Sequence, residues 1–254
     1  MPQPHAGFAP VRWDGELDST NAEARRLAEA GAFGPLWIAA RRQTAGRGRQ
    51  GRVWAGGEGN LAATLLTPLD QPPAIAAQLS FVAALAVGQM LGDWAPAGDV
   101  RFKWPNDLLL GGRKVSGILI ESGRRDPAGL WLAIGVGVNL ASAPEGLEPP
   151  AASLAAHLPP GRPVPRPEEA LASLDRSFGH WFGVWRGEGG FAAVRAAWLE
   201  RAAGLGQPCT ARVGTRSLSG VAEGLGADGA LLLRLASGAL ERITAGEVFF
   251  GAPA

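Results

Sequence analysis

The alternation of apolar and polar positions divides the first 140 residues into two helices and several strands. Ser19 and Thr20 are good N-cap residues before the helix formers of 22–28, so we expect a helix that ends near Gly31. A second, buried helix is expected over 75–91, an apolar run without proline. Shorter apolar runs predict strands at 36–40, 61–66, 100–104, 114–121 and 130–140.

The second half of the chain changes character twice. Proline and glycine accumulate between Pro144 and Pro167, which indicates a surface loop. Helices are expected next, over 168–185 and 191–203. After Gly204, short β-like runs separated by Gly or Asp-Gly turns predict a small β-barrel, with strands at 209–213, 217–222, 230–235, 239–243 and 248–250.

These patterns predict an α+β fold with two domains. Residues 1–203 would form a mixed β-sheet with helices packed against it, and residues 204–254 would form the small barrel. The 46% hydrophobic content of the 254 residues is sufficient to fill such a core.

Composition excludes several classes of protein. The net charge of +1 lacks the basic excess of a general nucleic-acid or membrane-surface protein. Cys209 is the single cysteine, which excludes an internal disulfide and a cysteine-based metal cage. Residues 1–10 lack the pattern of a signal peptide, and no uninterrupted apolar run reaches the roughly 18 residues of a membrane helix. We therefore expect a soluble, cytoplasmic protein that does not bind membranes.

Lysine is rare in this chain. Among 24 Lys and Arg residues, only Lys103 and Lys114 are lysines. Surface lysines can drift to arginine in a chain rich in Arg, Ala and Gly, so a retained lysine indicates a site that needs a compact ammonium group. Chance survival is the alternative, but both lysines lie in segments that carry other candidate chemistry.

The first of these segments is an arginine–glycine loop, Gly46-Arg47-Gly48-Arg49-Gln50-Gly51-Arg52-Val53-Trp54. Glycine lets a backbone approach a ligand closely, and the arginine fork fits carboxylate or phosphate. No Gly-Lys-Ser/Thr follows, so the loop is not a Walker A phosphate loop. On its own, it is equally consistent with an anion clamp and with a solvated or RNA-contacting loop.

Two further segments combine charge with small or rigid residues. In Lys103-Trp104-Pro105-Asn106-Asp107, the lysine can hold phosphate, and Asn106 or Asp107 can orient it or help to carry Mg²⁺. In the second segment, Lys114 opens a strand in which Ser116 and Gly117 leave room for a ligand. A plain turn and a hairpin with a surface lysine are the structural alternatives.

Taken in order along the chain, these segments resemble the biotin protein ligase family. Both lysines and all four asparagines of the chain fall within the similar positions, and the tail looks like the SH3-like domain of that family. The resemblance covers positions 19 to 140, on the segments 19–21, Gln43, 46–54, 59–61, 103–107, 114–119 and 135–140.

The resemblance implies roles for individual residues. Lys114 and Arg47 would be catalytic, and Asp107 is a candidate ligand of Mg²⁺, which would accompany ATP. The residues expected to bind biotin are Ser19, Thr20, Asn21, Gln43, Arg47, Gly48, Arg49, Lys114 and Gly117. The residues expected to bind the nucleotide are Arg49, Arg52, Trp54, Lys103, Asn106 and Asn139, and the segment 149–154 is suggested to approach adenine.

The implied reaction is ATP-dependent formation of biotinyl-5′-AMP, followed by biotin transfer to a lysine of a biotin carboxyl carrier protein of acetyl-CoA carboxylase. A carboxylate that attacks an α-phosphate meets like charge, which Lys114 and the arginines can neutralise. Only 18 residues precede Ser19, too few for a helix-turn-helix domain, so DNA binding is not expected. The resemblance leaves both a monomer and a homodimer open.

Two rival functions remain at this point. A lipoate ligase or octanoyltransferase would use the same scaffold, although a transferase needs a catalytic cysteine and Cys209 lies in the tail. An RNA-binding module would account for the arginines but not for the two lysines or the near-neutral charge. A test of which acid supports ATP–pyrophosphate exchange would distinguish the first rival from a biotin ligase. Salt-dependent RNA binding without ATP-dependent chemistry would favour the second rival.

Overall fold

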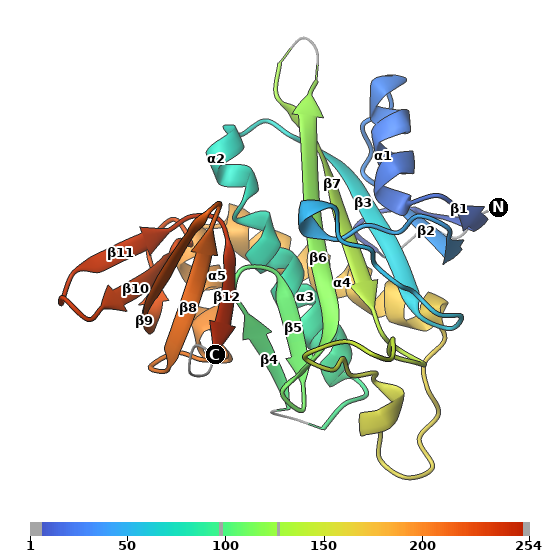
Figure 1. Cartoon of the computed structure of the whole chain (residues 1–254). Helices are drawn as coiled ribbons and strands as arrows, with labels where there is room; N and C mark the ends of the chain where they lie inside the picture. The colour runs from blue at the N-terminus through green and yellow to red at the C-terminus, as the bar shows by residue number, and fades with distance from the viewer. Residues whose placement is uncertain (1–6, 97–98, 126–127, 251–254) are drawn as a thin grey trace.

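A computed structural model of the chain describes residues 7–96, 99–125 and 128–250, and its centre is a seven-stranded sheet (Figure 1). The strand order is β1-β2-β3-β7-β6-β5-β4, with β1 and β2 parallel and the other neighbours antiparallel, so the predicted mixed sheet is confirmed. The strands are β1 (Val11–Leu17), β2 (Leu36–Gln43), β3 (Leu61–Leu69), β4 (Val100–Lys103), β5 (Asp107–Leu110), β6 (Arg113–Arg124) and β7 (Leu130–Val138).

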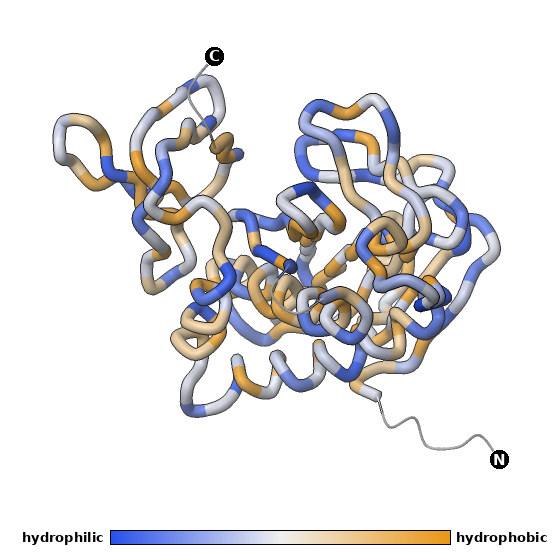
Figure 2. The backbone as a smooth tube through the Cα atoms, turned by 90° about the horizontal axis from the view of Figure 1, so that it is seen from below, coloured by the Kyte–Doolittle hydropathy of each residue, from blue (hydrophilic) through white to orange (hydrophobic). Residues whose placement is uncertain are grey.

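Helices cover both faces of this sheet. On one face, Ala24 and Ala28 of α1 (Thr20–Glu29) pack in a small cluster with Ile38 and Leu66. The main core includes buried residues of the other long helices and of the sheet, and apolar stretches line the elements that meet there (Figure 2). Those helices are α3 (Leu79–Gly92), α4 (Pro167–Arg186) and α5 (Gly190–Leu199).

The predicted buried helix over 75–91 consists of α2 (Pro73–Ala76) and α3, joined through Ala77 and Gln78 in helical conformation. The segment Pro73–Gly92 is long and apolar enough to cross a membrane by length and composition. Within the fold, 67% of that window is buried, as in the core helix of a folded domain. Its apolar character on all sides reflects burial among the sheet and α4.

The sequence patterns missed two strands and misplaced one helix end. β1 and β5 were not predicted, although Val-Arg-Trp-Asp-Gly-Glu-Leu in β1 does alternate between apolar and polar positions. α5 ends at Leu199 rather than at 203. The reason for the early end is tertiary, because Arg201 and Ala203 leave the helix to pair their backbones with Phe102 at the edge strand β4.

The tail forms a five-stranded antiparallel sheet in the order β11-β10-β9-β8-β12, next to the β4 edge of the larger sheet (Figure 1). Trp104 donates its indole N–H to the carbonyl of Gly229 at 3.1 Å, and Cys209 and Leu231 belong to the same core as α3. The two sheets are therefore packed together. The strands are β8 (Pro208–Val213), β9 (Arg216–Leu225), β10 (Leu231–Leu235), β11 (Leu240–Ile243) and β12 (Glu247–Phe250).

Candidate functional site

A cavity of about 1090 Å³ opens between the two sheets. Its wall contains every residue that the sequence proposed for ligand binding or catalysis, brought together from segments up to 120 positions apart. These residues are Ser19, Thr20, Asn21, Gln43, Arg47, Gly48, Arg49, Arg52, Trp54, Lys103, Asn106, Asp107, Lys114, Gly117 and Asn139.

One end of the cavity is polar and uncharged. Gln43 reaches from the end of β2 to the start of α1, where its Oε1 accepts hydrogen bonds from the Thr20 backbone N–H at 2.8 Å and from the Thr20 hydroxyl at 3.2 Å. Ser19 and Thr20 are almost fully buried. Because Oε1 is already occupied by Thr20, the Gln43 amide group has its donor side available for a neutral ligand.

Asn21 lies beside these groups, but its amide is engaged by the protein. Its Oδ1 lies 2.7 Å from the Thr64 hydroxyl, and its Nδ2 donates to Glu121 Oε2 at 2.8 Å. A Cβ at Gly135 would come within 2.1 Å of Asn21 Oδ1, so that glycine is needed for this close approach. Asn21 therefore lines the cavity while it also fixes the start of α1 to the sheet.

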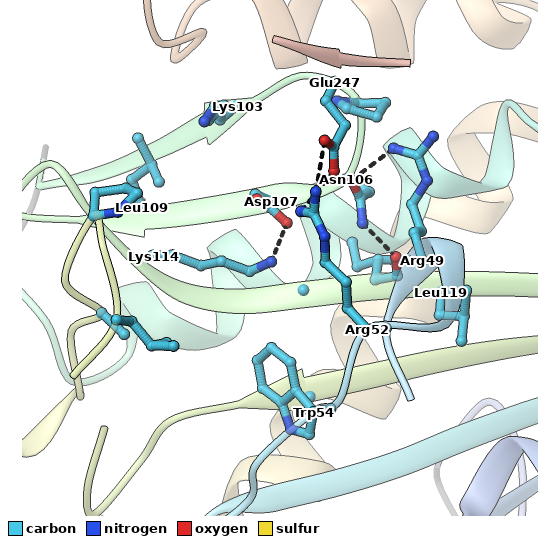
Figure 3. A pocket seen from close by; sticks show the side chains of 18 of the residues that line it. Arg49, Arg52, Trp54, Lys103, Asn106, Asp107, Leu109, Lys114, Leu119 and Glu247 are labelled. Atoms are coloured by element: carbon cyan, nitrogen blue, oxygen red, sulfur yellow. Dashed lines mark hydrogen bonds and ion pairs between the residues drawn. The ribbon is translucent and has the colours of Figure 1, made fainter. Parts of the chain in front are cut away.

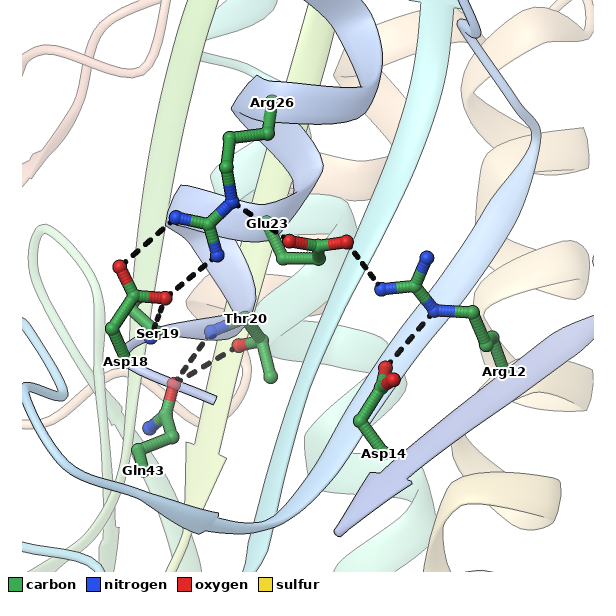
Figure 4. A network of polar contacts seen from close by, with 8 residues as sticks. All are labelled: Arg12, Asp14, Asp18, Ser19, Thr20, Glu23, Arg26 and Gln43. Atoms are coloured by element: carbon green, nitrogen blue, oxygen red, sulfur yellow. Dashed lines mark hydrogen bonds and ion pairs between the residues drawn. The ribbon is translucent and has the colours of Figure 1, made fainter. Parts of the chain in front are cut away.

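An ionic network on the solvent side holds the same helix terminus (Figure 4). Asp18 accepts two hydrogen bonds from the Arg26 guanidinium, at 2.7 and 3.0 Å, and these bonds lower the Asp18 pKa to about 2. Glu23 accepts bonds from Arg26 and from Arg12 of β1. The network joins β1, α1 and the loop before it, so it orients Ser19 and Thr20 toward the cavity.

Two glycines of the central sheet form part of the cavity floor. Gly117 of β6 and Gly137 of β7 are opposite each other in the sheet, and the Trp54 ring lies over both. A Cβ at Gly137 would come within 2.3 Å of that ring. Gly117 was predicted to bind biotin, whereas Gly137 lies in the similar segment 135–140 without a predicted role. The Gly135-Val136-Gly137 spacing puts two glycines on one face of a strand.

The middle of the cavity is charged (Figure 3). Lys114 of β6 forms a 2.6 Å ion pair with Asp107 of β5, and its ammonium lies 5.7 Å from the centre of the Trp54 ring. Arg49 donates to Asn106 Oδ1 at 3.1 Å, and Asn106 in turn donates to the Ile118 carbonyl. This arrangement fixes the loop arginine and the strand lysine on one wall.

Burial affects the cations on this wall. Desolvation lowers the pKa of Lys103 and of Arg49, because both side chains are partly removed from water. Of the side chains that line the cavity, seven are cationic and three are carboxylates. The cavity therefore suits a ligand with several negative charges.

Asn139 lies at the end of β7, where the chain segment after it returns along the cavity. Its Nδ2 donates to the Ala152 carbonyl at 3.0 Å, and its buried Oδ1 has no hydrogen-bond partner among the described residues. The Ala152 backbone N–H donates to the Lys114 carbonyl, which ties the segment to β6. Of the segment 149–154, Pro149, Pro150 and Ala151 line the cavity, and its approach to adenine stays a prediction.

Residues of the tail sheet also line the cavity, and none of them was predicted from the sequence. Arg52 of the loop forms a 2.6 Å ion pair with Glu247 of β12, and Arg212 and Phe249 stand nearby on the same wall (Figure 3 shows the Arg52–Glu247 pair). Nothing in the sequence near these positions signals a site.

A metal ion held by a cluster of protein ligands and a reactive cysteine both find no support in the described residues. No group of three His, Cys, Asp or Glu side chains in residues 7–96, 99–125 and 128–250 could hold a metal ion. Cys209 is buried away from the cavity wall, and burial raises the pKa of its thiol, which disfavours the nucleophilic thiolate.

Comparison with known proteins agrees with this geometry. The model of the "Biotin/lipoate A/B protein ligase family" matches residues 17–139, and that of the "Biotin protein ligase C terminal domain" matches residues 204–251. A biotin–[acetyl-CoA-carboxylase] ligase of Paracoccus denitrificans is 48% identical over 92% of this chain and 98% of its own length. The chain belongs to the biotin protein ligase family.

Solved structures of biotin protein ligases show the same fold. The Aquifex aeolicus enzyme in complex with biotin and ATP superposes with a TM-score of 0.79 at 26% identity, covering 97% of this chain and all of the other (100%). The Leishmania major enzyme in complex with biotinyl-5-AMP gives a TM-score of 0.66 at 25% identity, covering 93% and 99%. The α+β fold with its small tail domain and the family resemblance are thus confirmed.

Proposed function

We propose that this protein activates biotin with ATP to form biotinyl-5′-AMP and then transfers biotin to a lysine of the biotin carboxyl carrier protein of acetyl-CoA carboxylase. The single observation that carries this proposal is the division of the cavity into a buried neutral end at Thr20 and Gln43 and a wall with an excess of cations. A ureido ring needs neutral hydrogen-bond partners, whereas a carboxylate and a triphosphate need cations.

In the first step, a biotin carboxylate oxygen attacks the α-phosphorus of ATP. A new P–O bond forms, the bond between the α-phosphorus and the bridging oxygen breaks, and pyrophosphate leaves with the electron pair. Lys114 and Arg47 lie on the cavity wall, where they can neutralise the two anionic groups as they approach. No enzyme nucleophile takes part in this step.

In the second step, the amine of the carrier lysine attacks the carbonyl carbon of the mixed anhydride. The C–N bond forms, the C–O bond to AMP breaks, and the amine proton passes to solvent. Arg49 and Trp54 belong to the loop over the cavity and are assigned to enclosing the adenylate until the carrier arrives.

Mg²⁺ enters this proposal with the nucleotide. Asp107 would supply one carboxylate ligand. A single protein ligand fits an ion that is held mainly by phosphate oxygens rather than by a cluster of protein side chains. When bound, the ion would neutralise charge on the leaving pyrophosphate.

Several features stay predictions from the sequence. They are the cytoplasmic location, the absence of DNA and membrane binding, the choice between monomer and homodimer, and the domain boundary between residues 203 and 204.

The test is incubation of the protein with biotin, ATP and a carrier domain, with biotin-dependent ATP–pyrophosphate exchange measured in parallel. We expect exchange with biotin, and carrier biotinylation that requires ATP. Exchange with lipoate or octanoate but not with biotin would contradict the proposal and favour the rival acyl substrates. Salt-dependent RNA binding without any exchange would contradict it in favour of a binding module.

A further inference from the structure

A chain of hydrogen-bonding side chains leads from the neutral end of the cavity into the protein. The Thr20 hydroxyl lies 3.2 Å from Gln43 Oε1 and 2.8 Å from the hydroxyl of Thr64 on β3. The Thr64 hydroxyl lies 2.7 Å from Asn21 Oδ1, and Asn21 Nδ2 donates to Glu121 of β6 at 2.8 Å. Thr64 is fully buried, and neither Thr64 nor Glu121 lines the cavity. These side chains form a relay of hydrogen bonds behind the cavity wall.

The three oxygen–oxygen contacts of the relay share two hydroxyl hydrogens, because the amide oxygens at its ends can only accept. One contact is therefore without a hydrogen at any moment. The two shorter contacts, at 2.8 and 2.7 Å, have the distances typical of O–H···O bonds. When both are made, Thr20 donates to Thr64, Thr64 donates to Asn21, and the weaker 3.2 Å bond to Gln43 is given up.

This direction of the relay places the missing hydrogen at the cavity. Thr20 and Gln43 both line the cavity, and their side-chain oxygens then face each other with lone pairs only. Such a contact is unfavourable until a donor reaches it, and a ligand N–H group supplies one. In the reverse direction, Thr64 would donate to Thr20 and Thr20 to Gln43, so the hydrogen would already be present.

The orientation of the Asn21 amide sets the direction, and Glu121 sets the amide. A carboxylate only accepts, so it draws Nδ2 toward itself and leaves Oδ1 toward Thr64. The Leu119 carbonyl, 3.4 Å from Nδ2, favours the same orientation. Arg25 of α1 forms an ion pair with the other carboxylate oxygen of Glu121, so both oxygens are engaged.

We propose that Glu121 is a positioning residue for biotin. It acts through Asn21 and Thr64, and it leaves two facing acceptors at the neutral end of the cavity that an N–H group of the ureido ring satisfies. The inference rests on the proposed function and deepens it, because it explains why this end favours a ligand that donates over one that only accepts.

Glu121→Gln tests the relay, since glutamine has one acceptor oxygen where glutamate has two. The Arg25 guanidinium makes the stronger, charge-assisted bond, so the new amide should turn its oxygen to Arg25 and its N–H to Asn21. The Asn21 amide then reverses, and both hydroxyl hydrogens turn toward Gln43. Because about one hydrogen bond to the ligand is lost, we expect the dissociation constant of biotin to rise about tenfold, with the KM for ATP unchanged.

Removal of Arg25 separates the relay from the ion pair. In Arg25→Met, Glu121 still accepts from Asn21, so biotin binding should equal that of the wild type. In the double variant Glu121→Gln/Arg25→Met, the glutamine oxygen is free to face Asn21, and biotin affinity should recover. Glu223→Gln is the matched control, because it alters another Glu–Arg pair, with Arg234, away from the cavity wall.

Calorimetry measures biotin binding, and exchange kinetics measure the KM for ATP. NMR of the ligand-free protein reports the amide itself. The Asn21 amide protons should show nuclear Overhauser contacts to the side chain at position 121 in the wild type and the double variant, and to the Thr64 methyl group in Glu121→Gln.

Unchanged biotin binding in Glu121→Gln would overturn the proposal, as would an Asn21 amide that keeps its orientation there. Equal losses in Arg25→Met and Glu121→Gln, or no recovery in the double variant, would also overturn it and assign the effect to the ion pair. Reversal of the amide in a protein without biotin-dependent exchange would contradict the proposed function and leave the relay standing.

Discussion

Lys114 and Asp107 form an ion pair of 2.6 Å across the neighbouring strands β5 and β6, inside the cavity wall. The pair holds the Lys114 ammonium group at the cavity wall. Since a nucleotide with Mg²⁺ offers both a new anion for Lys114 and a new cation for Asp107, we expect the pair to separate when the substrates bind.

Replacement of the lysine tests this charge at the reacting centre. We expect Lys114→Ala to keep its fold, because the side chain is 40% exposed, and to lower the adenylation rate on the order of 10²–10³-fold. Biotin-dependent ATP–pyrophosphate exchange is the measurement, with circular dichroism as the folding control. Full activity in Lys114→Ala would contradict the assigned mechanism.

The glycine floor predicts a steric effect. Gly137→Ala would place a methyl group 2.3 Å from the Trp54 ring, so the loop must move, and we expect weaker ATP binding by at least about tenfold. Gly224→Ala, on β9 with no atom near its Cβ position, is the matched control. Tryptophan fluorescence and the KM for ATP report the outcome. Equal ATP kinetics in the two variants would show that Trp54 is not needed in this place.

Replacement of Cys209 distinguishes a ligase from a cysteine-dependent acyltransferase. Its buried thiol, with a raised pKa, lies outside the cavity wall, so we expect Cys209→Ala to retain its exchange and transfer rates. Loss of one buried sulfur atom should lower the free energy of unfolding by about 1 kcal/mol. Denaturant unfolding and carrier biotinylation measure the two effects. A variant that folds but transfers no acyl group would favour the transferase.

Lys103 predicts a pH dependence of nucleotide binding. Burial lowers its pKa, so the side chain is cationic at low pH and loses its charge earlier than an ordinary lysine as the pH rises. We expect the KM for ATP to rise on the alkaline side of a profile measured between about pH 7 and 10. Lys103→Arg should flatten that rise, because arginine stays charged. An identical profile in both proteins would assign the alkaline change to another group.

The Asp18–Arg26 pair predicts a small acid-dependent term in stability. The Asp18 pKa of about 2 in the folded protein lies below the ordinary value of 3.8, so the pair stabilises the fold above about pH 4 and this contribution is lost as the pH falls toward 2. The effect is modest since both side chains are about half exposed. Urea unfolding of Asp18→Asn at pH 6 and pH 3 should show a wild-type advantage that shrinks in acid. Glu188→Gln, which removes an exposed carboxylate without an ion pair in the described residues, should show no such change.

The local patterns of the sequence determined most elements of the fold. The helix formers after Ser19, the apolar run of α3 and the Asp-Gly turn at Asp228 act between near neighbours, so they can be recognised without a structure. Ser19 holds the N-cap position, although its side chain makes no capping hydrogen bond. β1 does show an alternation of apolar and polar residues, although no strand was predicted there. β5 has only four residues, Asp107–Leu110, which are too few for a period to show.

The sequence by itself also pointed to many of the residues that line the cavity, since the loop around Arg47 and the segments at Lys103 and Lys114 carry unusual chemistry for this chain. Only the tertiary structure decided how they are arranged. It set Trp54 over Gly137, and it brought Glu247 to Arg52 across 195 positions. Contacts of that separation arise from the packing of two sheets on one core, and they leave no periodic or local signal along the chain.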